Sequence, residues 1–85
     1  MVTKEITLSG RQGLESKPAA IFIQKASNFK STIWVEKNDR RVNAKSLLGL
    51  LSLAAENGTK VTIIAEGEDE QLAVNELSEY LKSIE

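Results

Sequence analysis

Apolar positions follow two different periods along the chain, and the changes of period predict the order of its elements. Near the N-terminus apolar side chains share one parity, as in a strand with one buried face: Val2, Ile6 and Leu8. The next apolar set has helical spacing: Ala19, Phe22, Ile23, Ala26 and Phe29. We therefore expect a strand, a glycine-containing loop over 9–13, and a helix capped by Ser16 that runs to about Asn28.

The middle of the chain predicts a β-hairpin followed by a second helix. Residues 32–37 and 40–43 read as two strands, and Asn38 and Asp39 between them tolerate the positive φ angles of a tight turn. A helix is expected to follow Ser46 and to end near 57–58.

The last third predicts one more strand over 60–66 and a final helix. Asp69 is placed to cap this helix, and Ala73, Leu77, Tyr80, Leu81 and Ile84 supply its inner stripe. The order βαββαβα, with short right-handed connections, favours an α+β fold: an antiparallel sheet with its helices on one face. We expect a single domain over 1–85.

Two apolar residues fall on the other side of the expected sheet. Trp34 and Ile64 have the opposite parity to their apolar neighbours on the same strands, so they should lie on the face that no helix covers. We interpret Trp34 as part of a cross-strand packing pair rather than as a platform for a ligand.

The densest apolar segment places five leucines in seven positions directly after Ser46: Leu47, Leu48, Leu50, Leu51 and Leu53. A short helix buries only part of its circumference. We assign Leu50 and Leu53 to the core and Leu48 and Leu51 to the surface, with Leu47 between these roles. Ser46 has two interpretations: the ordinary N-cap of a buried helix, or a modifiable hydroxyl where a phosphate would meet backbone N–H groups and the helix dipole.

Composition restricts the available chemistry. The 85 residues include no cysteine and no histidine, which removes thiolate chemistry, the commonest general base and the commonest metal ligand. We expect no enzymatic activity, no metal and no cofactor. The lack of cysteine and of a long apolar run fits a cytoplasmic protein.

The charge is asymmetric although the net charge is only −1. Residues 66–85 hold seven acids and one base (−6), and residues 1–65 hold ten bases and five acids (+5). The bases are spread over several elements. A small nucleic-acid-binding module, or another protein-interaction module of the same fold, remains the alternative, and the former would need a basic sheet face that bears aromatic residues. An acyl-phosphate hydrolase would need a convergent arginine and asparagine loop, and none is recognisable.

Two motifs carry a resemblance to the HPr family, the phosphocarriers of the bacterial sugar phosphotransferase system. Residues 13–20 look like the active-centre loop of that family, and residues 42–53 resemble its regulatory serine helix. Both motifs sit at the family's spacing within the same order of elements. The resemblance implies an HPr-like open-faced two-layer sandwich, whose four-stranded antiparallel sheet has the order 1-4-2-3, with three helices on one face.

The same resemblance marks where this chain departs from a phosphocarrier. Glu15 stands at the position of the family's phosphate-accepting histidine, Lys17 at that of an arginine, and Ser16 at that of a usual alanine. A carboxylate would form an acyl phosphate rather than a phosphoramidate, so we expect no phosphocarrier activity. Glu15 has three interpretations: drift at a site released from catalysis, a favourable charge at a helix N-terminus, or a mimic of phosphohistidine.

The regulatory serine implies a set of partners. Histidine-less HPr paralogues that act in carbon catabolite repression resemble this chain best. The resemblance implies that HPr kinase/phosphorylase phosphorylates Ser46, and that the product binds catabolite control protein A, a LacI-type repressor, as a corepressor. The implied partner-binding residues are Leu47, Leu48, Leu51, Lys17 and Ala20. No direct contact with nucleic acid or membrane is implied.

The loop over 9–13 also suggests a route to self-association. It contains two glycines and joins the first strand to the rest of the chain. Exchange of that strand between two copies would form a homodimer from existing contacts.

Overall fold

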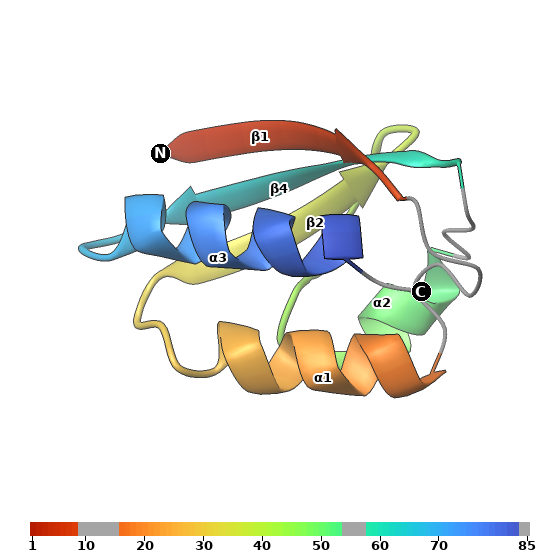
Figure 1. The fold of residues 1–85 in the computed structure, drawn as a ribbon, viewed down its shortest axis with the longest axis horizontal. Coiled ribbons are helices and arrows are strands. Elements are labelled where there is room, and N and C mark those ends of the chain that lie inside the picture. The colour runs from red at the N-terminus through yellow and green to blue at the C-terminus, as the bar shows by residue number, and fades with distance from the viewer. Residues whose placement is uncertain (9–15, 54–57, 84–85) are drawn as a thin grey trace.

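The computed structural model describes residues 1–8, 16–53 and 58–83, and Figure 1 shows a sheet with helices packed along one side. The expected order βαββαβα is confirmed. The elements are β1 (Val2–Thr7), α1 (Ser16–Ala26), β2 (Thr32–Lys37), β3 (Arg40–Asn43), α2 (Leu47–Ser52), β4 (Lys60–Glu66) and α3 (Glu70–Ser83).

The sheet is antiparallel and has the expected strand order, β1-β4-β2-β3. β4 lies inside the sheet and pairs with both β1 and β2, whereas β1 and β3 form the two edges. The hairpin of β2 and β3 turns at Asn38 and Asp39, with φ angles of 49° and 69°. Positive φ at both central residues is what the tight hairpin turn requires, so the predicted turn is confirmed.

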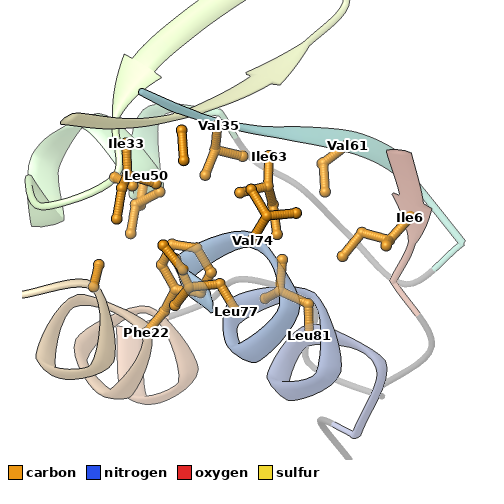
Figure 2. Close-up of a cluster of buried hydrophobic side chains, with 14 of the residues drawn as sticks. Ile6, Phe22, Ile33, Val35, Leu50, Val61, Ile63, Val74, Leu77 and Leu81 are labelled. Atoms are coloured by element: carbon orange, nitrogen blue, oxygen red, sulfur yellow. The ribbon is translucent and has the colours of Figure 1, made fainter. Parts of the chain in front are cut away.

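The core lies between the sheet and the three helices (Figure 2). The strands contribute apolar residues of one parity, as the alternation predicted. Each helix contributes the apolar stripe that faces the sheet. In α3, Val74 and Ser78 are also fully buried, in addition to the predicted stripe. Among the buried apolar residues are Ile6, Ile33, Val35, Val61 and Ile63 from the strands, and Phe22, Leu50, Leu77 and Leu81 from the helices. Tyr80 is partly buried against this core, and Ile84 lies outside the described residues.

Two helices, α1 and α2, end earlier than expected, and each ends in hydrogen bonds that span three residues instead of four. α1 stops at Ala26 rather than near Asn28, because the N–H groups of Asn28 and Phe29 bond three residues back instead of four. α2 stops at Ser52 rather than near 57–58, and the Leu53 N–H bonds the Leu50 carbonyl in the same way. Residues 54–57 lie outside the described part of the chain. At the other end of α1, Ser16 is the first helical residue rather than the cap before it.

Asp69 stands directly before α3 as expected, and its carbonyl accepts a hydrogen bond from the Ala73 N–H, but its carboxylate does not cap the helix. It reaches the α1–β2 loop, where it accepts hydrogen bonds from the backbone N–H groups of Lys30 (2.8 Å) and Ser31 (3.0 Å) and from the Ser31 hydroxyl. Ser31 is 1% exposed. The loops meet closely at Gly67, where an added Cβ would lie 2.6 Å from Ser31 Oγ. The hydrogen bond from the Ser31 hydroxyl, followed by that from the Lys30 N–H, lowers the pKa of Asp69.

Loss of this carboxylate should destabilise the fold in a pH-dependent way. Asp69→Ala leaves the buried Ser31 hydroxyl without its acceptor, so we expect a lower urea midpoint at pH 7. Because the folded-state pKa of Asp69 is depressed, its stabilisation is present above its unfolded pKa of about 3.9 and lost as pH falls below that value. The difference between wild type and variant should therefore shrink below about pH 4.

Urea unfolding from pH 7 to pH 2 checks this, with Glu68→Ala as the control, since Glu68 is an exposed carboxylate one position earlier. A difference between wild type and Asp69→Ala that stays constant over the whole range would contradict the role of the charged carboxylate.

Candidate functional site

Ser46 caps the N-terminus of α2. Its backbone is extended (φ −113°, ψ 116°), and its Oγ accepts a hydrogen bond from the Gly49 N–H at 3.1 Å. The Ser46 N–H donates in turn to the Asn43 carbonyl at 3.1 Å, which joins the cap to the end of β3. Ser46 is partly exposed. The predicted N-cap is therefore confirmed.

The neighbouring cation, Lys45, is held away from Ser46. Its ammonium group donates to the carbonyls of Phe29 (2.9 Å) and Ser31 (3.2 Å) in the α1–β2 loop. A phosphate on Ser46 would therefore find its favourable surroundings in the N–H groups and dipole of the first turn of α2 rather than in Lys45.

The leucines that follow Ser46 divide between core and surface as predicted. Leu50 and Leu53 are 0% and 4% exposed, and Leu50 lies in the core beneath the sheet (Figure 2). Leu48 is 83% exposed, and Leu47 and Leu51 are 43% and 38% exposed. We call Leu47, Leu48 and Leu51 the leucine patch. It lies on the helix that Ser46 caps, so the capping hydroxyl and an apolar surface lie on the same short element.

The structure brings α1 beside this helix. α1 and α2 pack against each other, as Figure 1 also shows. Lys17 and Ala20 are exposed in the first turns of α1, and their expected role at the flank of the leucine patch stays a prediction. Glu15 and the rest of 9–15 lie outside the described residues, so the interpretations of Glu15 stay predictions.

Two residues at this site were missed by the sequence analysis. Lys37 and Arg40 flank the β2–β3 turn, and both donate hydrogen bonds to the C-terminal end of α2: Lys37 to the Leu53 carbonyl (3.0 Å) and Arg40 to Ser52. Two cations beside a predicted turn were the only available signal. That signal does not reveal which side of the sheet the cations reach.

The uncovered face of the sheet carries the expected pair. Trp34 and Ile64 are register partners on β2 and β4, and Ile64 is 2% exposed although none of the described helices covers this face. The Arg41 guanidinium lies over the Trp34 ring, 5.7 Å from its centroid, and within 3.8 Å of Glu36. The other aromatic residues pack on the core. This face therefore presents one ring that is already engaged within the protein, which gives the nucleic-acid alternative no support.

Within residues 1–8, 16–53 and 58–83, no helix has both the length and the apolar character needed to cross a bilayer. In the same ranges no three carboxylates gather closely enough to hold a metal ion.

The sequence and fold of the chain match a known family. The family model described as the PTS HPr component phosphorylation site covers residues 2–83, and the chain belongs to the HPr family. Its sheet order and its helices on one face are those of HPr structures.

Particular relatives are similar to the chain over nearly its full length. The HPr-like protein Crh of Bacillus subtilis is 46% identical over 82 residues, which is 96% of this chain and 96% of Crh. A crystal structure of HPr-C-His from Thermoanaerobacter tengcongensis has a TM-score of 0.95 at 43% identity, covering 98% of this chain and 93% of that one. The crystal structure of Bacillus subtilis Crh, described as a dimer with a swapped domain, has a TM-score of 0.77 at 47% identity, covering 95% and 93%. The chain is thus a homologue of both Crh and HPr.

The leucine assignments predict losses of stability of very different size along one helix. Leu50→Ala should lower the free energy of unfolding by about 2–5 kcal/mol, because it leaves a cavity in the core. Leu48→Ala removes a side chain that is mostly in water, so it should cost less than about 1 kcal/mol. Urea unfolding of the two variants measures both values, and equal losses would show that the exposed assignment of Leu48 is wrong.

Proposed function

We propose that this chain is a regulatory member of the HPr family that acts in carbon catabolite repression in the cytoplasm. In this proposal HPr kinase/phosphorylase phosphorylates Ser46, and the product binds catabolite control protein A, a LacI-type repressor, as a corepressor. The observation that carries the proposal is the geometry of α2. The partly exposed Ser46 caps the helix, and the mostly exposed Leu48 lies two residues away. Homology to Crh, whose solved structure bears the name catabolite repression HPr, supports it.

The chemistry of the chain argues against a role in the phosphotransfer relay. The sequence contains no histidine, and Glu15 stands where the resemblance to HPr expects the phosphate-accepting one. An acyl phosphate on a carboxylate is a different intermediate from the phosphoramidate of a histidine. The proposal therefore assigns the chain a binding role, without phosphocarrier activity.

Phosphorylation would change recognition more than fold. Ser46 already has the extended backbone of an N-cap, and the Gly49 N–H in the first turn of α2 already donates to its Oγ. A phosphate adds a charge of about −1.5 to −2 at pH 7 at this point. Because the leucine patch begins at the next residue, the modified surface would combine a strong anion with exposed apolar side chains. A partner that matches both features would prefer the phosphorylated form.

The proposed docking surface comprises the leucine patch together with Lys17 and Ala20. Its parts come from α1 and α2, which pack side by side. Exposed apolar residues at the centre with a cation at the flank fit the usual anatomy of protein interfaces, in which buried apolar anchors carry most of the binding energy.

A homodimer is part of the proposal. β1 forms an edge of the sheet and pairs with β4. The crystal structure of the homologue Crh is described as a dimer with a swapped domain. We propose that β1 can pair with β4 of a second copy through the same register, so that the dimer reuses the contacts of the monomer.

Phosphorylation by the kinase should occur on Ser46 and should switch binding on. After incubation with HPr kinase/phosphorylase and ATP, mass spectrometry should find one phosphate, absent in Ser46→Ala and retained in Ser52→Ala. Calorimetry should then show that the phosphorylated chain binds catabolite control protein A at least about tenfold more tightly, equivalent to about 1.4 kcal/mol. Leu48→Ala should weaken that binding by more than about 1 kcal/mol, as expected for an interface anchor.

The matched control is the phosphotransfer relay itself. Incubation with phosphoenolpyruvate and the first enzyme of the relay should leave the chain unlabelled. Stable label from the relay, a phosphate outside Ser46, or equal repressor binding by both forms would overturn the proposal.

A further inference from the structure

The C-terminal end of α2 is held by cations of the β2–β3 hairpin. Arg40 Nη1 donates to the Ser52 carbonyl at 2.9 Å, and Arg40 Nη2 donates to Ser52 Oγ at 3.1 Å. Lys37 Nζ donates to the Leu53 carbonyl at 3.0 Å. Lys37 and Arg40 are register partners on either side of the turn. The two-residue turn therefore places both cations beside the C-terminal end of α2.

These contacts matter because α2 has only six residues. The last carbonyls of any helix lack partners within it, and an isolated helix of this length does not form in water. Cationic donors satisfy such carbonyls and interact favourably with the negative end of the helix dipole. The hairpin thus supplies hydrogen-bond donors for the last carbonyls of α2, which have no partners within the helix.

The same hydrogen bonds connect the hairpin to the proposed phosphorylation site. Ser52 Oγ accepts from Arg40 and donates to the Gly49 carbonyl at 2.7 Å. The Gly49 N–H is the group that donates to Ser46 Oγ. Hydrogen bonds from Arg40 to Ser52 and from Ser52 to Gly49 therefore connect, through the Gly49 backbone, to the hydrogen bond that Gly49 makes with Ser46.

We propose that Arg40 and Lys37 are positioning residues of the docking surface. They hold the last turn of α2, and they thereby fix Leu51 and Leu48 at a set place relative to Ser46. The inference rests on the proposed function, since it concerns the same surface. It adds that the affinity of this surface for the repressor is controlled from the hairpin, by residues whose hydrogen bonds are made within the chain.

Arg41 offers a matched control for Arg40. The two arginines are adjacent on β3 and carry the same charge, but they serve opposite faces of the sheet. Arg41 lies over Trp34 and near Glu36, whereas Arg40 reaches Ser52. Alanine at either position changes the net charge equally, but only Arg40→Ala removes hydrogen bonds to the end of α2.

The first test compares repressor binding by the Ser46-phosphorylated variants. Arg40→Ala should weaken binding to catabolite control protein A about three- to tenfold, the range expected for lost hydrogen bonds. Arg40→Lys keeps a donor and should lie between wild type and Arg40→Ala. Arg41→Ala should stay within about twofold of wild type. Equal effects of Arg40→Ala and Arg41→Ala would mean that charge alone matters and would overturn the inference.

Hydrogen exchange of the unphosphorylated chain tests the positioning without any partner. Amides of residues 50–53 should exchange faster in Arg40→Ala than in wild type, while amides of α3 and β4 keep their protection. Unchanged exchange at 50–53, or a uniform loss of protection, would contradict a local role. If Arg40→Ala fails to fold, Arg40→Lys gives the same two readouts.

A double-mutant cycle separates positioning from direct contact with the repressor. If Arg40 acts through the leucine patch, Arg40→Ala should have a smaller effect in a Leu51→Ala background than in wild type. Additive, salt-sensitive effects would instead indicate that Arg40 touches the partner, and would overturn the inference. The positioning role and the docking surface can be overturned independently of each other. Loss of binding in Leu48→Ala but not in Arg40→Ala contradicts only the positioning role, and binding unaffected by either contradicts the docking surface.

Discussion

The proposed site depends on a helix that is too short to be stable alone. α2 has six residues, and forming one helical turn costs more conformational entropy than its few hydrogen bonds return. Three sets of contacts offset that cost. Ser46 caps the first turn, Leu50 anchors the middle in the core, and the hairpin cations take the last carbonyls. The position of every exposed group on α2 follows from these fixed points.

A helix held in this way can leave some of its apolar side chains exposed to water, because its position does not depend on their burial. With Leu50 and Leu53 committed to the core, helical geometry sends Leu48 outward and leaves Leu47 and Leu51 at the margin. In a longer helix such residues would have more neighbouring turns to pack against. The exposed leucines are thus a consequence of a short element with fixed ends, and the proposed regulation uses them beside a hydroxyl that already caps the helix.

The local sequence pattern was sufficient to predict the order of the elements and to separate the buried from the exposed leucines of α2. Parity identified the buried face of each strand, and spacing separated Leu50 from Leu48, because both depend only on neighbours in the chain. The contacts of Asp69 with Ser31 and of Arg40 with Ser52 join residues far apart in sequence, and no periodic signal encodes them. The resemblance to HPr supplied the strand order, which periodicity alone could not have chosen. Glu15 lies outside the described residues, so its role rests on that resemblance.

The most direct test of the account maps where the repressor docks. Nuclear magnetic resonance of the isotope-labelled, Ser46-phosphorylated chain, titrated with unlabelled catabolite control protein A, reports the affected amides. We expect line broadening to begin in α2 and in the first turns of α1, around Lys17 and Ala20, while the face around Trp34 keeps its signals. Broadening centred on Trp34 or on α3, with α2 unaffected, would contradict the claim that this short helix is the recognition element.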